Sequence, residues 1–177
     1  MPLYSRRGGR APSAAQLDGL LDLANAGLVL GNDGWISNGT GSVCLRPAET
    51  TPVVSAEMST DEFGHTWLTR RAAKGDLAMM ASELRGICAS LEEAGSGKSL
   101  LCALVPFRNS ADDAMAMIYR FKRGAWYPFV PAGDHKRDNS RELGLQAALS
   151  DQLTIEPDLT KWSPLWGAPG MPVAPAS

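Results

Sequence analysis

Two stretches of the chain carry apolar residues at the spacing of a helix that buries one side. Residues 14–27 follow Ser13, a good capping residue, and Gly27 is expected to end this helix. Asp76 is expected to cap a second and clearer helix over residues 77–94. The two apolar stripes consist of Leu17, Leu20, Leu21 and Ala24 in the first helix and of Leu77, Met80, Leu84, Ile87 or Cys88, and Leu91 in the second.

A third helix is predicted over residues 140–151, because Asn139 and Glu142 have the spacing of a capping box. Short runs rich in apolar and β-branched residues, bounded by Gly, Pro, Asn and Asp, predict strands between the helices. The predicted strands are residues 28–30 and 35–37 around the turn 31–34, residues 42–47, two strands within 53–71 joined near 61–64, residues 100–107, and a hairpin of residues 115–123 and 126–130.

This order of elements predicts an α+β fold. We expect a single domain in which an antiparallel sheet carries helices packed on one side, in the order α-β-β-β-α-β-β-β-α. Residues 1–13 are predicted to be a flexible basic arm, residues 14–170 the folded domain, and residues 171–177 a flexible tail.

The hairpin suggests a surface for a partner. Gly124 and Ala125 are predicted to form a two-residue turn that pairs Arg123 with Trp126, Lys122 with Tyr127, and Arg120 with Phe129. One face, formed by Met117, Tyr119, Phe121, Trp126 and Val130, is then expected to be core. The other face carries Arg120 and Lys122 beside Tyr127 and Phe129. Such a face is typical of a solvated surface or of a docking surface, with nucleic-acid binding a third alternative.

The sequence Gly-Ser-Gly-Lys-Ser at residues 95–99 matches the end of a phosphate-binding loop but lacks its context. The first glycine of GxxxxGK[ST] would fall at position 92, which is Glu92. A phosphate-binding loop also runs from a strand into a helix, whereas here a helix is predicted to end and a strand to begin. We therefore interpret Gly95 as the residue that closes the helix, and we expect no nucleotide site.

Composition adds little chemistry. Apolar residues make up 44% of the chain, charged residues 20%, and the net charge is −2, so no general attraction to nucleic acid is expected. Cys44, Cys88 and Cys102 are widely spaced, which favours buried reduced thiols and a cytoplasmic protein. The two histidines, His65 and His135, are interpreted as solvated or loop residues.

Adjacent carboxylates at Asp61 and Glu62 are not expected to act as an acid/base pair, because neighbouring side chains in a strand or turn point apart. No apolar run follows the N-terminal arginines and none approaches the length of a bilayer span, so neither a secretory signal nor a membrane-spanning helix is predicted. The basic arm is expected to give at most weak peripheral contact with a membrane.

Several long blocks resemble one protein family. These are STDEFGHTWL, LEEAGSGKSLLCALVPFR, IYRFKRGAWYPFVPAGDHKRDNSRELGLQAAL and IEPDLTKWSPLWGAPG, which together span about residues 55 to 170. They are similar to the PspA-associated protein PspAB family. The resemblance implies association with PspA, the membrane-stress protein of the phage-shock response, and a link to HtpX-type membrane proteases. It implies no enzymatic activity, active site or cofactor.

Three hypotheses for function remain open at this point. The first is a non-enzymatic cytoplasmic adaptor of the PspA stress response that binds a PspA-type or HtpX-type protein through Arg120, Lys122, Tyr127 and Phe129, or through Trp162 and Trp166. The second is a small-molecule-binding protein or an enzyme of unknown reaction, for which a deep pocket with convergent polar groups would speak. The third is a structural homo-oligomer, such as a homodimer. No catalytic, cofactor-binding or metal-ligating residue is predicted.

Overall fold

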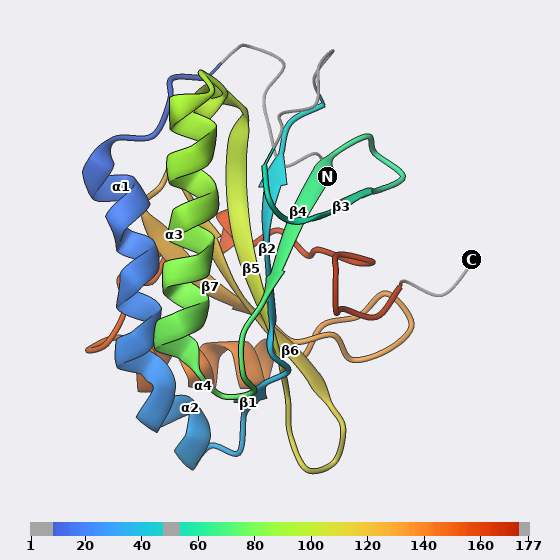
Figure 1. Cartoon of the computed structure of the whole chain (residues 1–177). Helices are drawn as coiled ribbons and strands as arrows, with labels where there is room; N and C mark the ends of the chain where they lie inside the picture. Colours follow the sequence, from blue (N-terminus) through green and yellow to red (C-terminus); the bar gives the residue numbers. More distant parts are fainter. Residues whose placement is uncertain (1–8, 48–53, 174–177) are drawn as a thin grey trace.

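A computed structural model describes residues 9–47 and 54–173 (Figure 1). The helical elements are α1 (Ala14–Asp18), the 3₁₀ helix η1 (Gly19–Ala26), α2 (Gly27–Asn32), α3 (Leu77–Glu93), the 3₁₀ turn η2 (Gly97–Ser99), α4 (Asn139–Leu149) and the 3₁₀ turn η3 (Leu159–Lys161). The strands are β1 (Ile36–Ser37), β2 (Thr40–Leu45), β3 (Glu57–Thr60), β4 (Thr66–Arg71), β5 (Leu100–Arg108), β6 (Ala114–Arg120) and β7 (Ala125–Phe129).

The strands form one antiparallel sheet of seven strands in the order β3-β4-β2-β5-β6-β7, with β1 paired to β5. The helices lie on one face of this sheet, and Figure 1 shows α1 and α3 running side by side over it. The predicted α+β class, the antiparallel sheet and the single-sided helical layer are therefore confirmed. None of the helices in the described residues is both long and apolar enough to cross a membrane.

The first helical stretch is longer than the sequence predicted. It runs through Gly27, which has ordinary helical angles (φ −57°, ψ −44°), and continues to Asn32, so the expected stop at Gly27 and the expected strand at residues 28–30 are both wrong. Its buried residues, Leu17, Leu20, Leu23, Ala26 and Leu30, recur mostly every third residue. That spacing suits the three residues per turn of a 3₁₀ helix, which explains why η1 winds tightly between α1 and α2.

This helical stretch also approaches the sheet closely. The Trp126 indole N–H donates to the Gly19 carbonyl over 3.3 Å, and the Tyr119 hydroxyl donates to the Gln16 carbonyl. A Cβ atom at Gly19 would collide with the Tyr119 hydroxyl. Glycine at this position therefore allows the helix to rest directly on the aromatic side chains of β6 and β7.

The predictions for α3 and for the loop after it are confirmed. The Asp76 side chain accepts from the Met79 amide at 3.0 Å, and the expected stripe is buried against the sheet. Gly95 has φ +75°, the left-handed conformation expected of a residue that closes a helix. Lys98 lies in η2, which leads into β5, so the chain runs from helix to strand and not in the direction of a phosphate-binding loop.

The start of α4 differs by one residue from the prediction. Asp138, and not Asn139, caps the helix, since its side chain accepts from the Arg141 amide at 2.9 Å. Glu142 is not part of a capping box. Its carboxylate is buried, accepts from the Val130 amide at 2.9 Å and is bonded to Arg137. The capping-box spacing was therefore coincidental, and this glutamate instead joins α4 to the end of β7.

The β6–β7 hairpin has a longer turn than predicted. Residues 121–124 form the turn, and Arg120 pairs with Ala125, Tyr119 with Trp126, Ile118 with Tyr127, and Ala116 with Phe129. The predicted pairing of Arg120 with Phe129 is therefore wrong. The error is a shift of an even number of residues, so each side chain keeps its face. All five residues expected in the core, Met117, Tyr119, Phe121, Trp126 and Val130, lie in the core on the helical side.

The opposite face of the sheet is covered by the end of the chain. We call residues 156–171 the C-terminal strap; this segment lies on the side of the sheet away from α1 and α3 (Figure 1). A second apolar core forms beneath it from Cys44, Trp67, Leu101, Cys102, Leu104, Ala114, Ala116, Ile118, Tyr127, Phe129, Trp162, Leu165, Ala168 and Met171. Met171, assigned to the tail by sequence, is buried there. Of the predicted arm at residues 1–13 and the predicted tail at residues 171–177, residues 1–8 and 174–177 lie outside the described residues.

Candidate functional site

The residues predicted to bind a partner lie beneath and beside the C-terminal strap. Tyr127 and Phe129 are both fully buried, so the expectation that they form an open docking face is wrong. The Trp162 ring stacks on Tyr127 with centroids 6.1 Å apart, and the Trp166 ring meets Phe129 edge-on at 5.2 Å. The predicted aromatic residues are thus brought together, but mainly with one another, as an internal cluster.

The two predicted cations occupy different positions. The Arg120 guanidinium donates to the Lys161 carbonyl over 3.1 Å and so helps to hold the strap. Lys122 is exposed in the hairpin turn, where its backbone carbonyl accepts from the Gln16 amide group. Neither cation lies on an exposed aromatic surface.

Arg137 fastens the strap more firmly. Its guanidinium donates to both carboxylate oxygens of buried Glu142 at 2.9 Å and to the Trp162 carbonyl, and it lies 5.3 Å from the centre of the Phe129 ring. Burial raises the pKa of Glu142, and the hydrogen bonds from Arg137 and from the Val130 amide only partly offset this effect. Arg137 therefore joins α4, β7 and the strap in a single contact.

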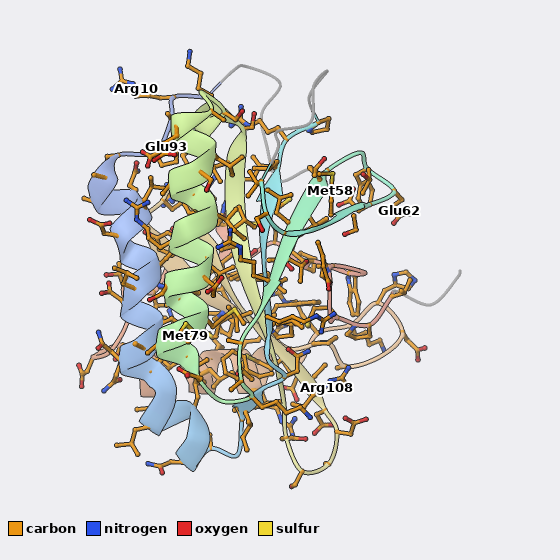
Figure 2. The ribbon with its side chains drawn as sticks, viewed as in Figure 1. Arg10, Met58, Glu62, Met79, Glu93 and Arg108 are labelled. Atoms are coloured by element: carbon orange, nitrogen blue, oxygen red, sulfur yellow. The ribbon has the colours of Figure 1, made fainter. Side chains whose placement is uncertain are left out.

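An open pocket remains where the strap meets the turn between β3 and β4. Its volume is about 250 Å³. It is lined by Asp61, Glu62, Phe63, His65, Trp67, His135, Pro164, Leu165, Trp166 and Ala168. Figure 2 shows Glu62 at the outer end of the β3–β4 turn, on the side of the sheet away from the helices. Phe63, next to it, is 67% exposed, which is unusual for a phenylalanine.

Asp61 organises the floor of this pocket. One carboxylate oxygen accepts from the Phe63 and His65 amides, each at 2.9 Å. The other oxygen is 3.0 Å from the His65 ring Nδ1 and accepts from the Trp67 indole N–H at 3.1 Å. Burial would raise the pKa of Asp61, but the hydrogen bonds from Trp67 and His65 outweigh it, so the pKa is lowered and the carboxylate stays ionised.

The structure corrects the interpretation of one histidine. His65 is 4% exposed and packs into the pocket wall, so it is not solvated, although it does lie in the loop before β4, as the second of the two predicted alternatives says. His135 does lie in a loop, as expected, and its ring centre is 6.1 Å from that of Trp166. Glu62 is exposed, the Asp61 side chain is 19% exposed, and both residues line the pocket, so it stays a prediction that the two carboxylates point apart.

The reactive groups of the described lining are few. Asp61 and His65 form a carboxylate–imidazole pair, and no serine, threonine or cysteine is among the described residues that line the pocket. The described residues also contain no cluster of three or more metal-ligating side chains. All three cysteines are free and buried, and burial raises the pKa of the Cys88 thiol to about 12, so this thiol stays protonated.

Sequence reasoning missed the pocket because its parts lie far apart in the chain. Trp67 follows His65 by two residues at the start of β4, so the two side chains are expected on the same side of an extended chain, and Asp61 lies just before them in sequence. This local spacing could have suggested that Asp61 bonds to both side chains. Nothing local indicates that Trp166 and His135 complete the other wall, because that requires the path of the strap.

A family model described as PspA associated protein B matches residues 50–170. The match includes the β3–β4 turn, the hairpin and most of the strap, and therefore all the residues that line the pocket. No curated protein matches the chain, and no solved structure matches it.

Proposed function

The chain belongs to the PspA associated protein B family, and from this premise we propose that it is a non-enzymatic accessory protein that binds a PspA-type protein in the cytoplasm. The pocket between the β3–β4 turn and the C-terminal strap is the proposed contact site. The family description supports the association with PspA, and the pocket supplies a surface on which a protein partner could be held.

The observation that carries this proposal is the aromatic character of an open, preformed pocket. Phe63 is 67% exposed beside a cavity of about 250 Å³ that Trp67 and Trp166 help to line. Aromatic residues supply much of the binding energy at protein interfaces, particularly when one partner offers a pocket for an anchor of the other. The four hydrogen bonds to Asp61 hold the turn in place, so this turn would lose little conformational entropy when a partner binds.

The test is a binding titration with purified PspA from the same organism. We expect Phe63→Ala to weaken binding by about 30-fold, which corresponds to the roughly 2 kcal/mol of an interface hot spot. Leu28→Ala is the matched control, because Leu28 is 76% exposed but belongs to α2 on the helical side of the sheet. If the two variants and the parent bind PspA with equal affinity, the pocket is not part of the PspA interface.

A second candidate function is the binding of a small molecule. It is favoured by one observation, the buried Asp61–His65 pair that opens into the same pocket, since convergent polar groups in an apolar cavity are typical of ligand sites. A thermal-shift screen against a metabolite library would detect such a ligand. A hit whose effect disappears in His65→Gln, together with no binding of PspA, would favour this alternative over the adaptor.

A further inference from the structure

We propose that the pocket receives a positively charged side chain of the partner protein, specifically an arginine. This inference rests on the proposed function and adds the chemistry of the anchor that enters the site. It follows from the charges of the lining, from the aromatic walls and from the room available.

The ionisable side chains of the lining are two carboxylates and two histidines. Asp61 and Glu62 both line the pocket, and Glu62 lies at the outer end of the turn (Figure 2). In the part of the chain that the structure describes, Glu62 takes part in no side-chain hydrogen bond and no ion pair, and neither lysine nor arginine lines the pocket. Among the described residues, the lining therefore presents two carboxylates with no lysine or arginine to balance them.

Aromatic residues line the same pocket as these carboxylates. Phe63 projects into solvent beside Glu62, and Trp166 forms the wall on the strap side. The faces of such rings attract cations, and arginine is the commoner cation in these contacts. A guanidinium can stack flat on a ring while its edge donates two hydrogen bonds to a carboxylate, which an ammonium group cannot do.

The size of the site fits this occupant. Its volume of about 250 Å³ is far above the roughly 30 Å³ that one water occupies in the liquid, so a long side chain can enter. An apolar anchor such as leucine would fill the same space but would strip water from Glu62 without offering it a hydrogen bond. Because that desolvation is unfavourable, the carboxylate selects against an apolar anchor.

The first experiment uses a defined probe. The peptide acetyl-Gly-Arg-Gly-amide is titrated into the full chain, and the indole N–H signals are followed by NMR, with a Trp166→Phe variant to assign the Trp166 signal. We expect saturable shifts of the Trp166 signal. Replacing arginine by citrulline, which keeps the shape and removes the charge, should weaken binding at least 10-fold, and replacing it by leucine should do the same.

Variants of the chain test whether Glu62 supplies the negative charge that binds the arginine peptide. Glu62→Gln should weaken binding of the arginine peptide about 10-fold, and Glu62→Lys should abolish it. Glu93→Gln is the matched control, because Glu93 is equally an exposed glutamate but lies at the end of α3, far from the pocket (Figure 2). Equal binding of the arginine, citrulline and leucine peptides, or equal binding by the Glu62 and Glu93 variants, would overturn the inference.

Titration of the same variants with PspA separates this inference from the proposed function. If PspA binding is lost in Phe63→Ala but unchanged in Glu62→Gln and Glu62→Lys, the adaptor function stands and the arginine anchor is wrong. If the arginine peptide binds through Glu62 but PspA does not bind, the pocket chemistry stands and the partner is wrong. If neither ligand binds, both fail.

Discussion

Asp61 is the residue on which the local geometry of the pocket depends. Its two oxygens accept from two backbone amides, from the Trp67 indole and at the His65 ring nitrogen, so it fixes the turn and two side chains together. Replacing a residue with so many partners is destabilising, because each buried donor left without an acceptor lowers the free energy of unfolding by about 1–3 kcal/mol.

We therefore expect Asp61→Asn to lower the free energy of unfolding by about 1–3 kcal/mol. The asparagine amide would place an NH₂ group where one of the two Asp61 oxygens accepts, and both oxygens accept hydrogen bonds, so at least one donor loses its partner. Urea denaturation followed by tryptophan fluorescence measures this change. Asp112→Asn, in an exposed loop, is the control and should be close to neutral. Unfolding of both variants at the parent's midpoint would show that the network does not stabilise the fold.

Lys98 illustrates a residue whose sequence context suggests more than its structure supports. It lies in η2 between a helix and a strand, and Gly95 closes that helix. We expect Lys98→Ala to leave the melting temperature within about a degree or two, as for most surface substitutions. We also expect calorimetry to show no binding of ATP or GTP. Tight nucleotide binding that disappears in the variant would contradict this reading of the loop.

Single residues were predictable from sequence where the cause was local. Asp76 and Gly95 were identified correctly because capping and helix closure depend on a few neighbouring backbone groups. Glu142 and His65 were not, because their partners come from elsewhere in the fold or from a turn whose shape the sequence did not specify. Glu142 bonds to Val130, at the end of β7, and to Arg137, whose position depends on the strap.

At the scale of elements, helices and strands were easier to predict than their connections. The hairpin faces came out right although the turn was wrong, because an even shift of register preserves the alternation of side chains. From sequence, the strap was considered only for Trp162 and Trp166, as candidate partner-binding residues. The strap has little regular structure, so its sequence has no apolar periodicity that would predict that it covers a face of the sheet.

The strap should contribute strongly to stability through Trp162. This side chain is buried, stacks on Tyr127 and donates its indole N–H to the Glu156 carbonyl at 2.9 Å. We expect Trp162→Ala to lower the free energy of unfolding by about 3–5 kcal/mol, as for other large aromatic side chains in cores. The control is Leu159→Ala, in the same segment of the strap but 51% exposed, which should lower the free energy of unfolding by less than about 1 kcal/mol. Thermal melting of both variants decides whether the strap is part of the cooperative unit.

At the scale of the whole molecule, one sheet lies between two apolar cores of different construction. Helices cover one face, and the irregular strap covers the other. This explains why β5 is a continuous apolar run, since its residues from Leu100 to Phe107 are buried on both faces. It also explains the error about the hairpin, because Tyr127 and Phe129 belong to the second core and not to an open surface.

Several carboxylates of the molecule have altered pKa values. The hydrogen bond and charge of Arg123 hold the pKa of Glu156 below its usual range, and hydrogen bonds from Thr160 and from Asn109 lower the pKa of Asp158 and of Asp113. Burial acts in the opposite direction on Glu142, whose pKa is raised. These groups therefore make opposing contributions to the dependence of stability on pH.

Low pH should destabilise the protein through the carboxyl groups whose pKa is lowered. A carboxyl whose pKa is lowered in the folded state binds a proton more readily in the unfolded state. As the pH falls below about 4, near the usual pKa of Asp and Glu, the unfolded state therefore binds more protons than the folded state. The stability that such a group contributes is present above that pH and is lost as the pH falls through the folded pKa. Glu142 opposes this trend, because its pKa is higher in the folded state than in the unfolded state. Its contribution to stability is present at low pH and is lost as the pH rises above about 4. Since Asp61, Asp113, Glu156 and Asp158 all have lowered values, we expect a net loss of stability in acid.

Glu156→Gln tests this sign at one position. Glu156 is buried and forms two hydrogen bonds of 2.8 Å with Arg123, so the variant should be less stable than the parent at pH 7. The difference should shrink as the pH falls through the folded pKa, because protonation removes the same charge from the parent. Urea denaturation at pH 7, 5, 4 and 3 measures it, with Glu93→Gln as the control that should track the parent at every pH. A gap between parent and Glu156→Gln that stays constant down to pH 3 would mean that the ion pair with Arg123 does not couple folding to protonation.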